Sequence, residues 1–151
     1  MAKYWEDYKV GEKFETPGRT AGEGMINTIA GLAGYTLPIF WDEEEAKRTE
    51  FKTRIAPGRL TLLLMGALDE LAGFWDPATI IAVVGYKNIQ LKAPLRMGDT
   101  IRVEAELTEK RETAKPSRGI IICQTICKNQ RGEILIEIDQ NVLLVKRRPN
   151  P

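Results

Sequence analysis

The chain has 151 residues, a length that suits one domain with its own core, and its 43 % apolar and 28 % charged residues exclude a disordered protein. The net charge of +1 gives no electrostatic basis for binding nucleic acid, and we expect no such partner. The chain contains no histidine, which excludes Ser-His-Asp and Cys-His catalytic arrangements and the common zinc motifs, and we expect neither a metal ion nor a resident cofactor.

The first third of the chain has helix signals after some short extended pieces. Thr20 and Glu23 have the spacing of a capping box, which predicts a helix over about 23–33. Asp42 is a good N-cap for a second, short helix that ends near Thr49, and the acidic residues after it suit the positive end of a helix dipole.

The strongest helical pattern begins at Pro57 and Gly58 and ends at Gly73. Apolar residues recur within it at helical spacing: Leu60, Leu63, Leu64, Ala67, Leu68 and Leu71. Because they cover more than one face, we expect this helix to be well buried.

The second half of the chain changes to the patterns of strands. Strands are predicted over 80–91, 101–107, 119–128 and 133–145, in meander-like succession. Cys123 and Cys127 lie about 13 Å apart along the third of these, too far for a disulfide, and we expect buried thiols.

One long apolar helix and an antiparallel sheet make a complete two-layer structure if the sheet wraps the helix. We therefore predict a single α+β domain over residues 1–151 with the hot-dog fold, an antiparallel β-sheet wrapped around a long central helix.

Nothing in the sequence indicates export or contact with a membrane. The first ten residues, MAKYWEDYKV, lack the apolar segment of a signal peptide. The apolar run over 60–72 is interrupted by Asp69 and Glu70, and a membrane helix needs about 18 apolar residues. We expect a cytoplasmic protein.

The order of the segments resembles the MaoC-like hot-dog proteins, which include (R)-specific enoyl-CoA hydratases and related acyl-thioester dehydratases. The resemblance covers nearly the whole chain and is carried by WEDYKVGEKF, TAGEGMINTIAGLAG, LPIFWDEEEAKRTEF, RIAPGRLTLLLM, NIQLKAPLRMGDTIRVEAEL and NQRGEILIE. It implies an acyl thioester as ligand, carried by coenzyme A or an acyl carrier protein, and a place in fatty acid metabolism.

In this sequence, the loop that corresponds to the family's catalytic loop lacks the acid–base groups expected there. Active hydratases carry a pattern like GDxNPxHxD, in which Asp and His form the acid–base dyad and Asn helps to hold it. By resemblance, Tyr35 stands at the Asp position, Leu37 at the Asn position and Phe40 at the His position, while Pro38 and Asp42 match. Leucine and phenylalanine cannot exchange protons and tyrosine has a pKa near 10, so we expect ordinary hydratase activity to be lost and the catalytic residues are unknown.

The resemblance also points to residues that bind the substrate. A family pattern IAHG appears as IAPG, in which Pro57 replaces His. By resemblance, the Gly58 N–H would donate to the thioester carbonyl; the alternative is that Gly58 only begins the helix. Tyr35, Phe40 and Trp41 either fill the volume of a former cavity or form an aromatic wall for an acyl chain, or Tyr35 has a new role as an acid. Four basic residues are candidates for the phosphates of coenzyme A: Arg59, Lys87, Lys92 and Arg96.

Three functions remain open. In the first, the chain is an acyl-thioester-binding protein without ordinary hydratase activity. It would act alone or as the non-catalytic member of a mixed pair with a catalytic MaoC-like subunit. It is otherwise a diverged hydratase or thioesterase that uses other acidic residues, with Asp42 and Glu43 as the first candidates. The third function is a structural scaffold subunit with a filled pocket. In each case we expect a homodimer or higher oligomer, since pairing removes an exposed strand edge.

Overall fold

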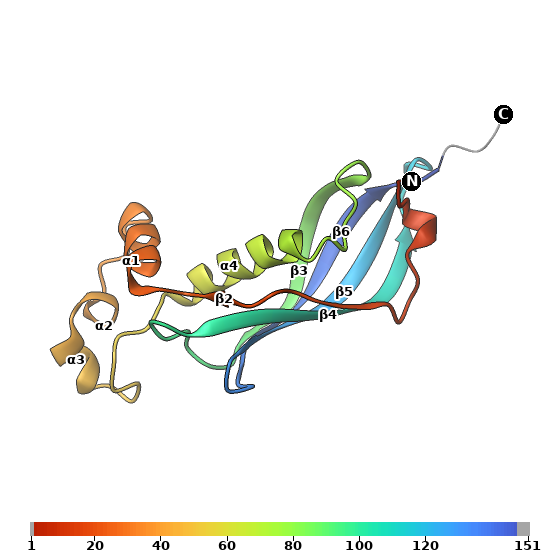
Figure 1. Cartoon of the computed structure of the whole chain (residues 1–151). Coiled ribbons are helices and arrows are strands. Elements are labelled where there is room, and N and C mark those ends of the chain that lie inside the picture. Colours follow the sequence, from red (N-terminus) through yellow and green to blue (C-terminus); the bar gives the residue numbers. More distant parts are fainter. Residues whose placement is uncertain (1, 148–151) are drawn as a thin grey trace.

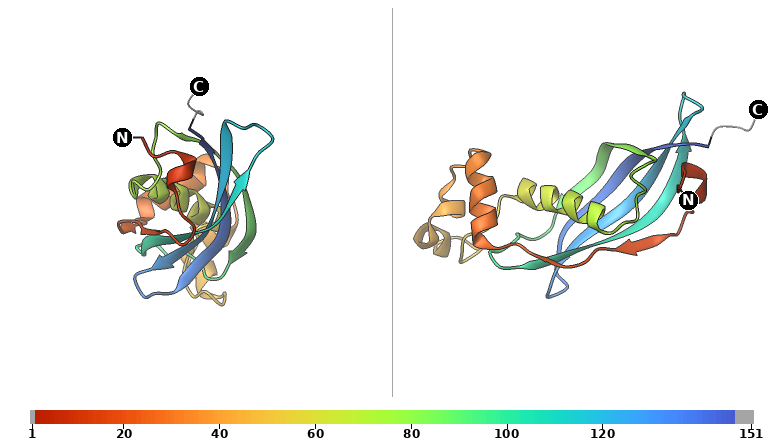
Figure 2. Two further views of the ribbon diagram at one scale, coloured as in Figure 1. Left: turned by 90° about the vertical axis from the view of Figure 1, so that its right-hand side faces the viewer. Right: turned by 45° about the horizontal axis from the view of Figure 1, so that its top comes forward.

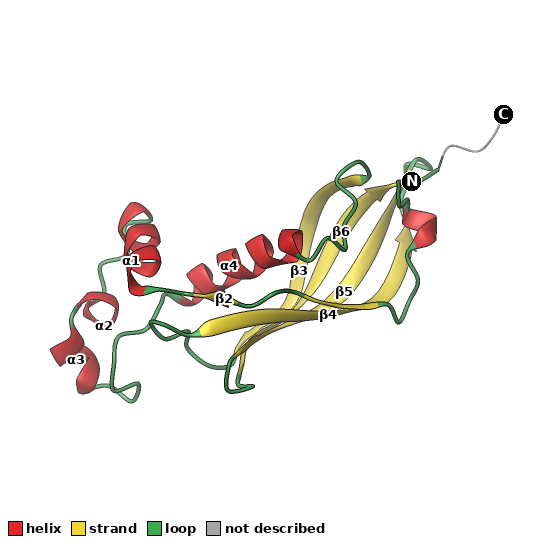
Figure 3. Cartoon of the chain, viewed as in Figure 1, coloured by secondary structure: helices red, strands yellow, loops and turns green. Residues whose placement is uncertain are grey.

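In the computed structural model, which describes residues 2–147, a curved antiparallel sheet holds one long helix on its concave side, and three short helices lie beyond one end of the sheet (Figure 1). The helices are a 3-10 turn at Trp5–Asp7, α1 (Glu23–Leu32), α2 (Pro38–Trp41), α3 (Glu43–Lys47) and α4 (Gly58–Leu71). The strands are β1 (Lys13–Glu15), β2 (Arg19–Thr20), β3 (Ile80–Leu91), β4 (Thr100–Glu112), β5 (Arg118–Asn129) and β6 (Ile134–Val145). Figure 3 shows that the strands and α4 form one body and that α1–α3 form the other end of the molecule.

The strands follow the order β1-β4-β5-β6-β3, with β2 paired to β4 beside β1. The predicted meander is correct for β4, β5 and β6 but wrong for β3, which pairs with β6 at the far edge. The segment after β3 therefore crosses to the opposite side of the sheet before β4 begins. The alternation of apolar residues predicts strands but not their neighbours, so this crossing could not be seen in the sequence.

Helix α4 lies on the concave side of the sheet, as Figure 2 shows, and packs on it through one face. Its buried side chains are Leu60, Thr61, Leu64, Met65, Leu68 and Asp69. The apolar ones among them join a core with residues of β4, β5 and β6 that include Val103, Cys127 and Ile136. Leu63 and Leu71, on the other face, are 58 % and 59 % exposed, so the expected burial on more than one face is wrong for this chain. No helix in the described part of the chain has the length and apolar character needed to span a bilayer.

The helix ends agree with the sequence prediction better than the caps do. Helix α1 has nearly its predicted bounds, but its N-cap is Gly22, without a side-chain cap. The predicted capping residue, Thr20, lies in β2 instead, where its hydroxyl is 2.8 Å from that of Thr100. Asp42 is confirmed as an N-cap, because its Oδ1 accepts the N–H groups of Glu44 and Glu45.

Cys123 and Cys127 are both buried and unlinked, as predicted. Burial raises the pKa of each thiol to about 12, with the charge of Asp69 adding to the shift. Neither thiol is therefore a nucleophile at neutral pH.

Candidate functional site

The N-terminus of α4 offers a backbone donor. Pro57 is buried and precedes the first helical residue, with φ −53° and ψ 133°. The Leu60 N–H donates to its carbonyl oxygen at 2.9 Å. Gly58, as the first residue of a 14-residue helix, has an N–H that no acceptor within the helix can satisfy, and the helix dipole adds partial positive charge there. This end of α4 therefore suits a carbonyl or other partly negative oxygen.

A cavity of about 460 Å³ opens beside Gly58. Its wall is apolar at Leu91 and Ile136, and polar at Thr61 and Lys92. A Cβ atom at position 58 would lie only 3.0 Å from Leu91 Cδ1, so a larger residue here would press on the Leu91 side chain that lines the cavity. The volume lies in the range of pockets that hold small molecules.

The aromatic side chains of the loop before α3 pack on one another. The rings of Tyr35 and Phe40 meet edge to face, with centroids 5.6 Å apart. The Trp41 indole N–H donates to the Tyr35 carbonyl oxygen at 2.7 Å. Leu37 is 60 % exposed and directly precedes α2, which begins at Pro38. The residues that the sequence analysis places at the positions of the family's dyad, Tyr35 and Phe40, therefore pack on one another.

The loop and the start of α4 lie at the same end of the molecule (Figure 1). They are linked by a hydrogen bond of 3.4 Å from the Ile55 N–H to the Ile39 carbonyl oxygen. Tyr35, Phe40 and Trp41 do not line the cavity beside Gly58, however, so they do not plug it. The expected position of the ligand between the loop and Gly58, at a subunit interface, stays a prediction.

The two acidic residues that the sequence analysis names as the first catalytic candidates both make structural contacts. Asp42 caps α3. Glu43 accepts from the Arg54 backbone N–H at 3.2 Å and from its Nε at 3.3 Å. Hydrogen bonds from Thr53 and then Arg54 hold the pKa of the Glu43 carboxyl below its usual value. Neither residue lines the cavity beside Gly58.

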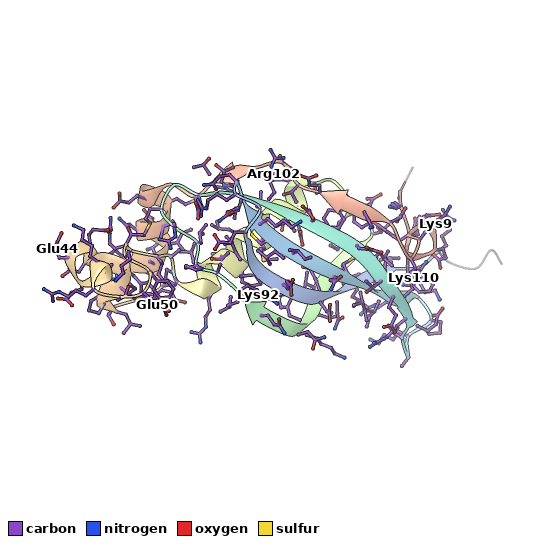
Figure 4. The ribbon with its side chains drawn as sticks, turned by 90° about the horizontal axis from the view of Figure 1, so that it is seen from below. Lys9, Glu44, Glu50, Lys92, Arg102 and Lys110 are labelled. Atoms are coloured by element: carbon purple, nitrogen blue, oxygen red, sulfur yellow. The ribbon has the colours of Figure 1, made fainter. Side chains whose placement is uncertain are left out.

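Glu50 is the carboxyl group that lines this cavity together with Gly58, and the sequence analysis missed it. It lies in an irregular segment between α3 and α4, where no periodic pattern or motif marks it. Figure 4 shows Glu50 at the helical end of the molecule and Lys92 where the sheet begins. A carboxylate and an ammonium group therefore border the same opening.

Of the four basic candidates, Lys92 is the one that lines the cavity. Its Nζ is 3.1 Å from Glu137 Oε2. Arg96 donates from Nη1 to the Phe51 carbonyl oxygen at 2.9 Å, which indicates a structural role. Within residues 2–147, no three Cys, Asp or Glu side chains come together in a way that could hold a metal ion.

Comparisons with known proteins agree with this architecture. Residues 7–125 match the family described as MaoC like domain. The chain is 31 % identical over 144 residues to an (R)-specific enoyl-CoA hydratase of Rhodospirillum rubrum, covering 95 % of this chain and 93 % of that protein. A MaoC-like dehydratase structure from the same organism is 27 % identical, with a TM-score of 0.86 over 97 % of this chain and 99 % of the other.

A third likeness shows the fold. A Mycobacterium tuberculosis protein described as having a double hot-dog fold superimposes with a TM-score of 0.82 at 19 % identity, over 99 % of this chain and 47 % of that one. Together with the helix held in the curved sheet, these findings establish that the chain belongs to the MaoC-like domain family and has the hot-dog fold.

Proposed function

We propose that the chain binds an acyl thioester, carried by coenzyme A or an acyl carrier protein, and lacks ordinary hydratase activity. The observation that carries the proposal is the Gly58 N–H, which starts a 14-residue helix beside a cavity of about 460 Å³. A thioester carbonyl oxygen is a suitable acceptor for that group. The name of the Rhodospirillum rubrum relative, an (R)-specific enoyl-CoA hydratase, supports this class of ligand.

The loss of hydratase activity follows from the loop. Adding water to an enoyl thioester needs a base for the water and an acid for the α-carbon, and each such group contributes about 10²–10⁴-fold in rate. Leu37 and Phe40 have no ionisable group, and Tyr35 stands where a carboxylate is expected. A retained backbone donor contributes about 10²–10³-fold, which polarises the carbonyl without moving a proton.

Two measurements on the unmodified protein test the proposal. Calorimetric titration with acyl-CoAs of short and long chains should show micromolar binding. The hydration of crotonyl-CoA should be slow or absent. No heat and no thermal stabilisation with any chain length would overturn the binding function and leave a scaffold subunit.

A second candidate function is a diverged enzyme, and Glu50 is the observation that favours it. Its carboxyl group borders the same cavity as Gly58, so a base for water would be available there. Turnover of an enoyl-CoA or an acyl-CoA at about 1–10³ s⁻¹, removed by Glu50→Gln, would establish this function in place of the first.

We also propose that the chain works as a dimer, with itself or with a catalytic MaoC-like chain. Support comes from exposed apolar side chains on α4 and on the edge strand β3. These side chains are Leu63, Leu71, Ile81, Val83, Val84, Tyr86, Ile89 and Leu91. A long apolar edge strand of this kind is normally covered in a stable protein. The cytoplasmic location stays a prediction.

A further inference from the structure

The cavity beside Gly58 has a charged mouth and a closed, apolar inner wall. Glu50 and Lys92 are exposed at the mouth, where Figure 4 labels both. Leu95 and Ile136, which form the inner wall, are each only 1 % exposed. Both belong to the core that α4 forms with the sheet, so the cavity ends against closely packed side chains.

This difference in polarity gives the proposed ligand a direction, and the inference therefore rests on the proposed function, with the thioester carbonyl oxygen at the Gly58 N–H. The polar arm of the carrier suits the mouth beside Glu50 and Lys92, which is open to water. The acyl chain gains free energy by leaving water, so it would lie against the inner wall at Leu95 and Ile136.

Ile136 is held firmly at the inner wall. On strand β6 it lies opposite Leu91 of β3 on one side and Cys127 of β5 on the other. Its branched side chain has few rotamers, and it packs in the same core cluster as Leu95. An acyl chain that reaches past this point would therefore have to displace packed core residues, which is costly.

The volume of the cavity sets the length of the chain. At about 30 Å³ for a group the size of a water molecule, a cavity of about 460 Å³ holds roughly fifteen such groups. The thioester group and the carrier arm that reaches the mouth share this space with the acyl chain, which leaves room for about six carbons.

We propose that Ile136 closes the acyl end of this site and limits tight binding to acyl chains of about six carbons or fewer. Ile136 is then a specificity-determining residue for the thioester. Leu91 lines the cavity and also belongs to the side chains that the proposed dimer covers, so a second chain would lie at the mouth. The inner wall at Ile136 is formed within one chain.

The test is calorimetric titration of the whole protein with a series of saturated acyl-CoAs: acetyl, butanoyl, hexanoyl, octanoyl and dodecanoyl. We expect the affinity to rise about fourfold for each methylene that the site buries, up to hexanoyl-CoA. Dodecanoyl-CoA should bind at least about tenfold more weakly than hexanoyl-CoA, because its chain overfills the cavity. An affinity that continues to rise through dodecanoyl-CoA would overturn the proposal.

Variants of the inner wall assign the limit to one residue. Ile136→Ala makes room for a longer chain and should raise the affinity for octanoyl-CoA relative to hexanoyl-CoA by at least about tenfold. Ile136→Val, a smaller change, should raise the same ratio about fourfold. Ile138→Ala is the matched control, because Ile138 lies on the same strand, is 2 % exposed and does not line the cavity. It should leave the ratio unchanged.

The outcomes separate this inference from the proposed function. If acyl-CoAs bind but folded Ile136→Ala and Ile136→Val keep the ratio of the unmodified protein, the inference is wrong and thioester binding stands. If Ile138→Ala shifts the ratio as much as Ile136→Ala, the core has loosened generally and the inference is also wrong. If no acyl-CoA binds to the unmodified protein, both fail. Ile136→Val removes less packing, so it protects the test against unfolding of Ile136→Ala.

Discussion

Asp99 and Arg131 join the turn before β4 to the turn between β5 and β6. Arg131 Nη1 donates to Asp99 Oδ1 at 2.9 Å and its Nη2 to Oδ2 at 3.3 Å, while the Asp99 carboxyl group is almost fully buried. We expect Asp99→Asn to lower the free energy of unfolding by about 1–3 kcal/mol at pH 7, because the guanidinium loses its buried partner. Chemical denaturation measures this change in the free energy of unfolding. Glu133→Gln, which removes an exposed carboxylate 3.5 Å from the same Arg131, is the control, with an expected change below about 1 kcal/mol.

The same pair predicts a pH dependence. Burial raises the pKa of Asp99, but hydrogen bonds from Arg131, Gln130 and the Arg96 N–H outweigh it and hold the pKa below 3.8. A carboxyl group with a lowered pKa contributes stability above its unfolded pKa and loses it as the pH falls through the folded pKa. The difference between the unmodified protein and Asp99→Asn should therefore be constant from pH 5 to 8 and shrink below about pH 4. A difference that grows with acid would contradict this assignment.

Asp69 should show the opposite behaviour. Burial raises its pKa from 3.8 to about 6, a hydrogen bond from Gln140 opposes the shift, and the charge of Glu70 adds to it. The folded state therefore holds a proton that the unfolded state releases between about pH 4 and 6, and stability falls as the pH rises through that range. Two pKa units correspond to about 3 kcal/mol.

Asp69→Asn measures this effect directly. The variant should lack the fall between pH 4 and 6 and should be at least as stable as the unmodified protein at pH 7.5. The titratable groups that face Asp69 from other elements are Tyr86 on β3 and the thiols of Cys123 and Cys127 on β5, whose pKa values all lie above this range. A variant that is less stable at pH 7.5 would show that the ionised carboxylate stabilises the fold.

The sequence predicted the long helix and the four long strands because each has a clear period, and Asp42 because a capping residue acts locally. It could not predict the burial of Asp69. In the run LLLMGALDEL this residue reads as a polar interruption, and only the contact of that helix face with the sheet shows that it is enclosed. The role of Glu50 was hidden for a similar reason, since its place beside Gly58 depends on an irregular segment.

The apolar α4–β3 surface predicts a dimer that one charge can disrupt. Val84 is 50 % exposed on the edge strand, at an irregularity in its pairing with β6. Val84→Lys should convert a dimer to monomers at micromolar concentration, because a buried interface would then hold an unpaired ammonium group. Sedimentation or light scattering measures the mass. Val10→Lys, the same substitution at a site that is 61 % exposed and outside this surface, should leave the dimer intact. An unmodified protein that is a monomer at this concentration would disprove the dimer.

A pair of substitutions at Gly58 tests the backbone donor. Gly58→Pro removes the N–H, and proline is well tolerated at the first position of a helix. Gly58→Ala keeps the N–H and adds a similar Cβ close to Leu91. If the N–H binds the thioester carbonyl, Gly58→Pro should bind acyl-CoA about three- to tenfold more weakly than Gly58→Ala, as measured by calorimetry. Equal affinities in the two variants would remove the Gly58 N–H from the site.

The last prediction concerns the proton-transfer groups missing from the loop. The triple variant Tyr35→Asp, Leu37→Asn and Phe40→His should gain measurable hydration of crotonyl-CoA, with Leu37→Asn alone as the inactive control. Leu37 is exposed, whereas Tyr35 and Phe40 are half-buried and pack on one another. Replacing either aromatic residue should therefore lower the free energy of unfolding by less than the about 3–5 kcal/mol expected for a fully buried one. Circular dichroism must show that the variant is folded before its kinetics are interpreted.

Two results would decide the nature of this loop. A folded triple variant that gains activity over an inert unmodified protein would show that the loop geometry still suits catalysis and that only the acid–base groups are absent. A folded but inert variant would show that the loop no longer faces the ligand. The second outcome has a structural basis, because neither Tyr35 nor Phe40 lines the cavity beside Gly58. If the triple variant is active, repeating the assay after mixing it with the Gly58→Pro chain would show whether a loop from one subunit serves the helix end of the other, since only a site shared between chains would lose activity in proportion to the mixing.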